Sequence, residues 1–488
     1  MNFGYVTENG VSSNSFRLAY LRIAECGIVI KLQGITNLDK KQEERMGIKV
    51  ALHNLGCKVN AYEVEAMQQL LEEAGYEIVP FEPGADVYLI NTCTVTNIAD
   101  RKSRQMLHKA KKMNPDAIVV ATGCYVQTDE GKLDKDEAVD LILGNNQKGN
   151  IVQVLQEYEQ QHTKQKHVLN INQTKEYEEL AINHTAEHVR AYIKVQDGCN
   201  QFCTYCIIPY ARGRVRSRKI AQVMDEVRAL AAKGYKEVVL TGIHLSSYGV
   251  DFPEEERETL LSLIQSVHGV EGVERIRLGS LEPRIITEEF ARTISSMPKM
   301  CPHFHLSLQS GCDTTLERMN RRYRSTEYAE KCDLLRKYFK NPALTTDVIV
   351  GFPMETEEDF QASYDFVESI HFYETHIFKY SRRHGTKAAA MSGQLTEAQK
   401  AVRSDKMLAL NEEHAREYEE SMIGSELKVL LEEEVEINGE QWYIGHSKEY
   451  IKTAVRKQDA YGVNDIITVK AERFLENHTL TGGVLCTE

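Results

Sequence analysis

The stretch Cys199-Asn200-Gln201-Phe202-Cys203-Thr204-Tyr205-Cys206 places three thiols within eight residues. A closed zinc site needs four ligands, and the nearest further candidates are the imidazoles of His184, His188 and His244. A cubane iron-sulfur cluster held by three thiolates instead keeps one iron open for a substrate or cofactor. The alternative is three unrelated core cysteines, which the dense and irregular spacing disfavours. The stretch therefore predicts an iron-sulfur cluster with an open iron.

The composition around this stretch is that of a globular protein. The chain has 488 residues, of which 42% are hydrophobic and 27% charged, and this length predicts about two to four domains. Its 11 cysteines, in a sequence that shows no secretory signal pattern, argue against a disulfide framework. The most apolar long segment, residues 18–32, is interrupted by charged side chains. We therefore expect a cytoplasmic protein that does not enter a membrane.

The net charge of −13 would argue against nucleic-acid binding only if it were evenly spread. Basic side chains gather in three runs, namely Arg212, Arg214, Arg216, Arg218 and Lys219; Arg318, Arg321, Arg322 and Arg324; and Lys379, Arg382, Arg383 and Lys387. Each run is open to two interpretations, a patch that contacts phosphates or solvated helix ends and loops.

Residues 1–45 show no clear domain pattern, and a convincing pattern begins at Met46. Gln42-Glu43-Glu44 can be encoded as CAGGAGGAA, which contains a purine-rich ribosome-binding sequence just before Met46. We therefore expect residues 1–45 to be a spurious or disordered extension from an over-extended gene start, in which Cys26 has no role. A native mass that includes Met1 would contradict this expectation.

Residues 46–157 alternate short apolar strands with amphipathic helices, which predicts a parallel α/β sheet. The expected helices cover residues 60–74, opened by Asn60 and Glu63 as a cap pair, and residues 100–113. The expected strands are 49–55, 87–91 and 117–122, and each is followed by a cysteine: Cys57, Cys93 and Cys124.

Parallel sheets gather ligand sites at the carboxyl ends of their strands, so these three cysteines can converge although they are far apart in sequence. The alternative is small buried hydrophobes at strand ends, because free cysteine is commonly buried. The repeated position after successive strands favours a second cluster with three thiolates. Basic residues on the helix at 100–113 could contact phosphates or solvate that face: Arg101, Lys102, Arg104, Lys109, Lys111 and Lys112.

A polar linker over residues 158–185 precedes a second α/β region, residues 186–422. Its apolar runs predict six parallel strands separated by helices, at 191–195, 237–241, 275–278, 303–308, 344–350 and 374–380. This pattern predicts a partial (β/α)6 barrel with catalytic groups at the carboxyl ends of its strands. The Cys199–Cys206 stretch follows the first of these strands.

Polar residues and glycines follow the later strands of this barrel, namely Gly242, Ser280, Glu282, Gln309, Asp347 and Gly351. For Ser280, Glu282, Gln309 and Asp347, a structural hydrogen bond and direct ligand contact remain equal alternatives. His244, His303 and His305 are assigned to packing, and Cys301, Cys312, Cys332 and Cys486 to structure, because their spacing is unlike that of ligands.

Residues 423–488 change to short alternating strands at 426–431, 440–447 and 467–474, with Asn438-Gly439 as a hairpin signal. This pattern predicts a small antiparallel β-barrel. It resembles the TRAM domain, an OB-like module associated with tRNA binding. The acidic run from Glu432 to Glu436 would repel phosphate, so only one face could meet RNA.

The Cys199–Cys206 stretch resembles the CxxxCxxC loop of radical S-adenosylmethionine enzymes, in which the open iron binds the amino and carboxylate groups of that cofactor. Tyr205 also fits this family, where the aromatic residue lies near the adenine. The resemblance implies that cofactor contacts come from Tyr205, Gly242, Glu282, Gln309 and Gly351. One departure is that Thr241-Gly242 replaces the usual glycine-glycine-glutamate run, so the ligand of the methionine amine is not assigned.

The flanks of the stretch, Gln196-Asp197-Gly198 and Ile207 to Gly213, resemble those of the methylthiotransferase family. The runs at 55–60, 91–97 and 123–125 resemble its amino-terminal domain, and the similarity covers nearly everything from Met46 to the end. Sister branches carry GCQMN-like or GCPKN-like runs at the first cysteine. The GCKVN run at 56–60 resembles the branch that acts on threonylcarbamoyladenosine in tRNA.

This resemblance implies a transferase that places a methylthio group on C2 of N6-threonylcarbamoyladenosine 37, beside the anticodon of tRNA. An unactivated aromatic C–H bond resists acid-base attack, so radical chemistry is required. A 4Fe-4S cluster at Cys199, Cys203 and Cys206 would cleave S-adenosylmethionine to a 5′-deoxyadenosyl radical. An auxiliary 4Fe-4S cluster at Cys57, Cys93 and Cys124 would hold the sulfur, methylated by a second S-adenosylmethionine.

The expected partners are tRNA, through its anticodon loop, an electron donor such as flavodoxin or ferredoxin, and a sulfur donor. Three alternatives remain, one of which is a plain electron carrier, which would need neither the six-unit barrel nor the terminal module. A sister enzyme would act on isopentenyladenosine 37 of tRNA or on a ribosomal protein, whereas a noncatalytic iron-sulfur protein would bind RNA without producing 5′-deoxyadenosine.

Overall fold

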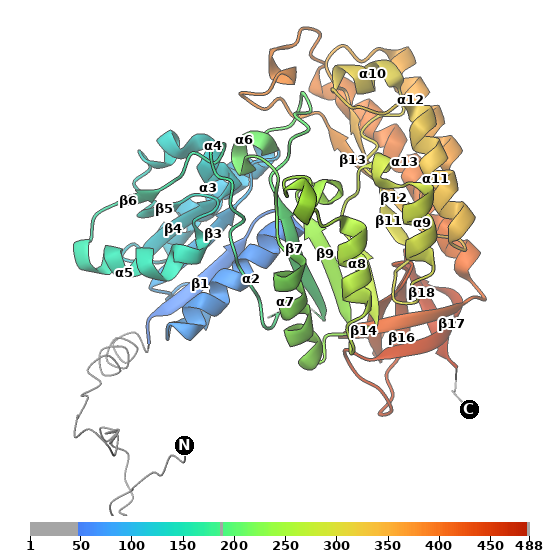
Figure 1. The fold of residues 1–488 in the computed structure, drawn as a ribbon, viewed down its shortest axis with the longest axis horizontal. Coiled ribbons are helices and arrows are strands. Elements are labelled where there is room, and N and C mark those ends of the chain that lie inside the picture. Colours follow the sequence, from blue (N-terminus) through green and yellow to red (C-terminus); the bar gives the residue numbers. More distant parts are fainter. Residues whose placement is uncertain (1–46, 186–188, 486–488) are drawn as a thin grey trace, which may run out of the picture.

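The computed structural model describes residues 47–185 and 189–485, which form three packed regions along the chain (Figure 1). The extension expected over residues 1–45, with Cys26, lies outside the described residues, as do His188 and Cys486. Within the described ranges, no helix combines the length and the apolar character needed to cross a membrane.

The first region is a six-stranded parallel sheet in the order β2-β1-β3-β4-β5-β6. Its strands are β1 Lys49–Asn54, β2 Glu77–Val79, β3 Val87–Thr92, β4 Ile118–Gly123, β5 Leu141–Leu143 and β6 Gln165–His167. The short β6 lies within the segment expected to be a linker. The prediction of a parallel sheet is confirmed.

Helices cover both faces of this sheet because successive strand side chains point to opposite sides. Leu107 and Ala110 of α3 (Asn97–Met113) and Tyr125 of α4 (Cys124–Leu133) pack on one face. Helices α2 (Lys58–Glu73) and α5 (Ile151–Gln161) cover the other, through Leu71 and Leu155 among others. The predicted cap pair is wrong, because α2 begins at Lys58 with Cys57 at its N-cap, while Asn60 and Glu63 are buried.

The second region contains six parallel strands in the spatial order β7, β9, β10, β11, β12, β13, with an isolated bridge between Leu281 and Leu306 joining its two halves. The strands are β7 Arg190–Asp197, β9 Glu237–Gly242, β10 Arg275–Leu278, β11 His303–His305, β12 Ala343–Val350 and β13 Glu374–Lys379. The two-residue β8 (Arg216–Ser217) pairs antiparallel with β7. These strands agree with the predicted partial barrel, although β11 is shorter than expected.

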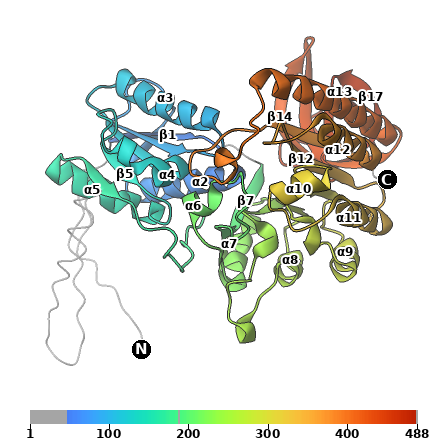
Figure 2. The ribbon, with the colours of Figure 1, turned by 90° about the horizontal axis from the view of Figure 1, so that it is seen from above.

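Helices follow the strands and form the outer layer of this barrel, which Figure 2 shows from above. They are α7 Ile220–Ala232, α8 Leu260–His268, α9 Glu288–Ser295, α11 Ser325–Tyr338 and α12 Glu357–Ile370, and their apolar sides share one core with the strands. The 26-residue helix α13, Glu397–Met422, leads to the third region.

The third region is a closed barrel in the order β14-β15-β16-β18-β17. Its strands are β14 Glu426–Ile437, β15 Glu440–Ser447, β16 Lys452–Arg456, β17 Ile466–Glu476 and β18 Thr479–Val484. The prediction of a small antiparallel barrel is confirmed, although β16 and β18 pair in parallel.

This small barrel docks at the amino ends of the parallel strands (Figure 1). Arg275 and Arg277 are buried, share the carboxylate of Glu237, and donate hydrogen bonds to backbone carbonyls of the small barrel. Tyr450, with φ of 73°, stacks on His303, and the Cζ of Arg277 lies 4.8 Å from the centroid of the Tyr450 ring. Tyr450 therefore fills that end of the parallel barrel.

Candidate active site

Three adjacent strands present the first group of thiols. Cys57 follows β1, Cys93 follows β3 and Cys124 follows β4, and these strands lie side by side in the sheet. Burial raises the pKa of the Cys93 thiol to about 11, and neighbouring charge on Cys124 and Cys57 adds to this rise. The structure thus brings together the three cysteines that the sequence separates.

Glycines shape the turns that carry these thiols. Gly56 has φ of 126°, and a Cβ there would lie 3.2 Å from the Cβ of Cys93. Gly123 has φ of 96°, and its Cβ would collide with the side chain of Asn91 and the backbone of Thr92. Both positions therefore exclude side chains so that the cysteine turns can approach one another.

Arg212 is the main polar contact of this group. Its Nε donates to Cys124 Sγ at 3.2 Å, and one terminal nitrogen donates to Asn60 Oδ1 at 2.7 Å. The Nδ2 of Asn145 lies 3.9 Å from the same sulfur. Sequence reasoning missed these contacts because it assigned Arg212 to a basic run and to a flank of the second cysteine loop, and gave it no contact with the first group of thiols.

The second group of thiols lies in the loop that follows β7. Cys199, Cys203 and Cys206 line a cavity of about 140 Å³ at the carboxyl ends of the barrel strands. Burial raises the pKa of Cys199 to about 11 and that of Cys206 to about 12, and charge on Cys203 adds to both. The metal-free thiols of Cys199 and Cys206 are thus protonated near neutral pH, so their binding to a cluster must release protons.

Several predicted cofactor residues line this same cavity: Tyr205, Glu282 and Gln309, together with Ser280. Gly242 and Gly351 do not line it. A Cβ on Gly242 would meet the Gln196 side chain, and one on Gly351 would meet Lys400 of α13. Their role as cofactor contacts stays a prediction.

Arg321 and His244 are among the lining residues that were not predicted as cofactor contacts. Arg321 Nη1 lies 3.4 Å from Cys203 Sγ, which places a half-buried positive charge beside the thiols. His244 shares a hydrogen bond of 2.7 Å between its Nδ1 and Ser247 Oγ, while its buried Nε2 has no hydrogen-bond partner among the described residues. Burial, with the charge of Arg321, lowers the pKa of His244 to about 4, so its imidazole is neutral at pH 7.

A further cavity of about 260 Å³ lies between the two groups of thiols. Val95 and Thr96, just after Cys93, form one side, and Tyr205 and Cys206 form another. Phe378 from the end of β13 also lines it and is 47% exposed. The cavity therefore offers an apolar surface that is bordered by Cys206 and by the segment that follows Cys93.

Buried ion pairs fix the two thiol loops relative to each other. Glu63 of α2 pairs with Arg212, Lys194 and Lys148, all of which are buried. Asp197 pairs with Arg216, and Arg218 pairs with Glu226, again in buried positions. Most of the first basic run is thus structural and does not contact phosphate.

The other basic runs divide between structure and surface. Arg383 is 4% exposed and binds Asp100 of α3, and Arg318 binds Asp359. The basic side chains of α3 are different, because most of them are exposed: Arg101, Lys102, Arg104, Lys109 and Lys112. Helix α3 begins at Asn97, one residue after the cavity residue Thr96, so the amino end of this helix lies next to the cavity.

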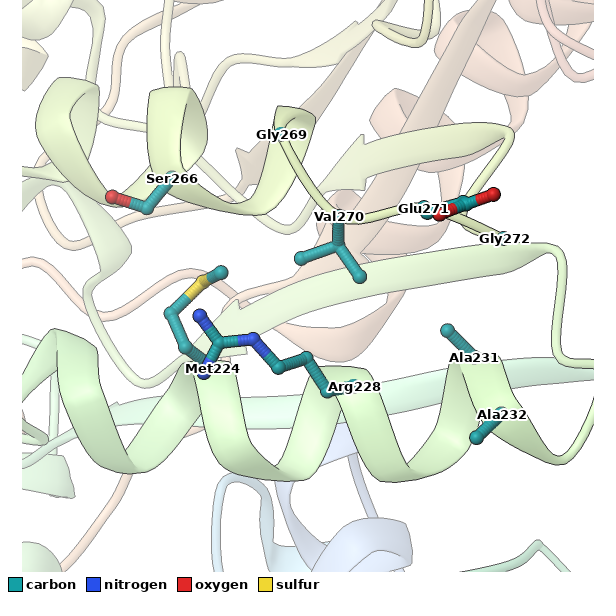
Figure 3. A pocket seen from close by; sticks show the side chains of 9 residues that line it. All are labelled: Met224, Arg228, Ala231, Ala232, Ser266, Gly269, Val270, Glu271 and Gly272. Atoms are coloured by element: carbon teal, nitrogen blue, oxygen red, sulfur yellow. The ribbon is translucent and has the colours of Figure 1, made fainter.

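An open groove of about 740 Å³ lies elsewhere, between α7 and the connection from α8 to β10. Figure 3 shows Met224 and Arg228 of α7 on one side of it and Ser266 and Val270 on the other. The thiols do not line this groove, so we do not assign the chemistry to it.

The spacing of the thiols distinguishes a cluster from a single metal ion. Four sulfurs around one zinc lie about 3.8 Å apart, as Zn–S bonds of about 2.3 Å require. Among the described residues, groups whose ligand atoms all lie within 4.8 Å of one another include neither cysteine triad. Wider, soft thiolate triads fit polynuclear iron-sulfur clusters.

Known proteins share this architecture. Residues 49–144 match the family described as uncharacterized protein family UPF0004, and residues 193–367 match the radical SAM superfamily. The structure of the radical S-adenosylmethionine methyltransferase TsrM from Kitasatospora setae is similar with a TM-score of 0.51 and 17% identity, covering 68% of this chain and 75% of that one. At this identity, the likeness shows the fold alone.

Sequence relatives are much more similar. The threonylcarbamoyladenosine tRNA methylthiotransferase MtaB of Bacillus subtilis is 41% identical over 86% of this chain and 91% of its own length. MtaB of Aquifex aeolicus is 43% identical over 79% of this chain and 93% of its own length. The tRNA-2-methylthio-N(6)-dimethylallyladenosine synthase of Moorella thermoacetica is 37% identical over 77% of this chain and 85% of its own length.

A partial parallel barrel with a three-cysteine loop after its first strand, together with the family matches, defines a radical S-adenosylmethionine enzyme. The chain belongs to the methylthiotransferases of this superfamily, in the MtaB branch.

Proposed function

We propose that the protein is a tRNA methylthiotransferase that converts N6-threonylcarbamoyladenosine at position 37 to its 2-methylthio derivative. The names of the MtaB relatives support the substrate. The observation that carries the reaction is the cavity of about 260 Å³ that is bordered both by the segment after Cys93 and by Cys206. One substrate base there would contact both sites.

Six cysteines would hold the two 4Fe-4S clusters: Cys199, Cys203 and Cys206 for one, and Cys57, Cys93 and Cys124 for the other. When bound, these clusters supply the reductive cleavage of S-adenosylmethionine and the sulfur for transfer. Tyr205, Glu282 and Gln309 line the smaller cavity and would orient S-adenosylmethionine there. Arg321 would balance negative charge beside Cys203.

The larger cavity would receive the base. Phe378 and Val95 present apolar surface that can stack against an extruded base and exclude water. The exposed basic residues of α3 would contact the RNA backbone beside the cavity. Because buried ion pairs hold the two thiol loops in place, the base must leave its stack in the anticodon loop to reach them.

The remaining partners follow from the reaction. A flavodoxin or ferredoxin would supply electrons, and a separate sulfur donor would restore the auxiliary site after each turnover. The small C-terminal barrel would contribute to tRNA binding. A cytoplasmic location suits these partners and stays a prediction.

The nucleoside profile of tRNA from a deletion strain tests the proposal. We expect loss of 2-methylthio-N6-threonylcarbamoyladenosine with accumulation of its precursor, measured by mass spectrometry. A normal level of that nucleoside, with loss of methylthiolated isopentenyladenosine instead, would assign the protein to the sister reaction. In vitro, reduced protein should release 5′-deoxyadenosine from S-adenosylmethionine, and a noncatalytic RNA-binding protein would not.

A further inference from the structure

Three adjacent strands of the parallel barrel carry a second kind of donor cluster. His305 lies on β11, Asp347 on β12 and His376 on β13, and the strands are neighbours in one sheet (Figure 1). In this sheet, His305 is in register with Thr345, and Asp347 with His376. Thr345 and Asp347 are two residues apart, so all four side chains share one face.

The ligand atoms of this His-Asp-His triad converge. One atom from each residue lies within 4.8 Å of the others. His305 Nε2 is 3.2 Å from Asp347 Oδ2, and the two imidazole rings stack with their centroids 5.6 Å apart. A simple ion pair with Asp347 would need only one imidazole, whereas here a second imidazole approaches the same point.

The remaining ring nitrogens also have partners. His305 Nδ1 lies 3.0 Å from Thr345 Oγ1, and His376 Nδ1 lies 3.5 Å from Glu374 Oε1. Metal-binding histidines commonly use their second nitrogen in this way, which fixes the ring and its tautomer. The arrangement therefore has both an inner set of three donors and an outer set that orients the imidazoles.

The triad lies next to the proposed base cavity. Asp347 itself lines that cavity, and Phe378, two residues beyond His376 on the same face of β13, lines it as well. The side chains of Asp347 and His376 are 26% and 44% exposed, so a bound ion would keep open positions toward this space.

We propose that His305, Asp347 and His376 bind one divalent cation of the Mn²⁺, Fe²⁺ or Zn²⁺ class, and that this cation binds the carboxylate of the threonyl group on the substrate base. Two imidazoles and one carboxylate suit these ions. The second half of the proposal rests on the proposed function. It gives a physical basis for substrate choice, because threonylcarbamoyladenosine carries a carboxylate and dimethylallyladenosine carries none. The triad thereby assigns a binding role to His305, which the sequence placed in packing.

The first experiment measures metal binding to the full chain with both clusters assembled and oxidised. Clusters of this type in that state give no EPR signal, so free Mn²⁺ can be counted directly during a titration. We expect about one tight site per chain in the wild-type protein and at least a tenfold weaker affinity in His376→Ala. Because His376 is exposed, its replacement should leave the fold intact. An unchanged melting temperature of the variant would verify this.

A matched control comes from a second donor group, formed by exposed His371 and Glu417 and buried His414. His371→Ala should leave the tight site intact. The proposal is overturned if His376→Ala binds Mn²⁺ as the wild type does, or if the tight site disappears in His371→Ala instead.

The second experiment compares two anticodon stem-loops that differ only at base 37, with threonylcarbamoyl or dimethylallyl adenosine. Removal of the ion, or His376→Ala, should weaken binding of the first RNA at least tenfold and leave the second unchanged. Lys379, which also lines the cavity, provides the competing explanation. If Lys379→Gln causes this selective loss and His376→Ala does not, a direct ammonium contact replaces the metal and the inference fails.

The two levels of the proposal fail separately. A wild-type enzyme that methylthiolates neither substrate would overturn the proposed function and the carboxylate contact, while the Mn²⁺ titration would still decide whether the metal site exists. A wild-type enzyme that converts threonylcarbamoyladenosine equally well with and without the ion would retain the function and overturn this inference.

Discussion

Arg212 and Cys124 are joined by a hydrogen bond of 3.2 Å from the guanidinium Nε to the thiol sulfur. Arg212 ends the short helix α6 (Ile208–Arg212), which begins two residues after Cys206, whereas Cys124 belongs to the first sheet. The same guanidinium binds both carboxylate oxygens of buried Glu63, at 2.6 and 3.0 Å. One side chain therefore links the loops of the two thiol groups.

Replacing Arg212 with Gln should alter the auxiliary cluster more than the other cluster. A hydrogen bond to a cluster sulfur stabilises the reduced, more negative state, so its loss should lower the reduction potential. The loss of one partner of Glu63 should also reduce the free energy of unfolding by about 3 kcal/mol. EPR-monitored redox titration and denaturant unfolding measure the two effects.

Arg214 provides the control for this substitution, because it is exposed and contacts the ring of Phe202 rather than a thiol of the first sheet. Arg214→Gln should leave the auxiliary potential unchanged. Equal shifts in both variants would indicate a general loss of positive charge instead of the specific contact with Cys124.

The two cysteine triads should contribute iron independently. Replacing Cys57, Cys93 and Cys124 together with Ala should reduce the iron content from about eight to about four atoms per chain, and replacing Cys199, Cys203 and Cys206 should do the same. Only the second variant should lose the uncoupled cleavage of S-adenosylmethionine. Iron analysis and 5′-deoxyadenosine assays measure this, and a complete loss of iron in either variant would contradict two separate sites.

Gly123 should tolerate no side chain. Its φ of 96° and the nearby Asn91 and Thr92 mean that Gly123→Ala would shift the turn that presents Cys124. We expect a loss of stability of about 1–3 kcal/mol together with selective loss of the auxiliary cluster. In the matched control, Gly131→Ala on α4, the new Cβ meets nothing within 4 Å, so stability should be unchanged or should rise by about 0.5–1 kcal/mol.

Glu237 should make the docking of the small barrel sensitive to acid. Burial raises its pKa, but the charge and hydrogen bond of Arg277, with the charge of Arg275, outweigh this and lower the pKa to about 2. A carboxyl with a depressed pKa in the folded state stabilises the fold above its unfolded pKa. This stability, about 3 kcal/mol, should disappear as the pH falls from about 4.5 to about 2.

Both the wild type and Glu237→Gln lose their clusters in acid. The difference in stability between the two proteins therefore isolates the contribution of the Glu237 carboxylate. The wild type should unfold at a higher denaturant concentration than the variant at pH 7, and the difference should shrink toward pH 3. A difference that stays constant over this range would contradict the assigned pKa.

The thiol sites could be predicted from the sequence because their signals are local. Cys57, Cys93 and Cys124 each follow an apolar strand, and the order of parallel strands then makes their convergence a matter of geometry. The contact between Arg212 and Cys124 spans 88 residues and gave no local signal. Strand β6 was missed because three polar residues at a sheet edge, Gln165–His167, show neither alternation nor an apolar run.

The cap of α2 shows how tertiary structure overrides a local motif. Asn60 and Glu63 have the spacing of a cap pair, yet both serve Arg212. The His-Asp-His triad was invisible for a related reason. His305, Asp347 and His376 become neighbours only through the register of β11, β12 and β13, which a single sequence does not specify.

Tyr450 gives the parallel barrel a floor. This ring stacks on His303 at the amino end, whereas the cysteine loops and Phe378 lie at the opposite, carboxyl end of the strands. A nucleotide bound at the carboxyl end of the strands would then cover the cavity in which it reacts. The substrate itself would keep the radical chemistry away from bulk water.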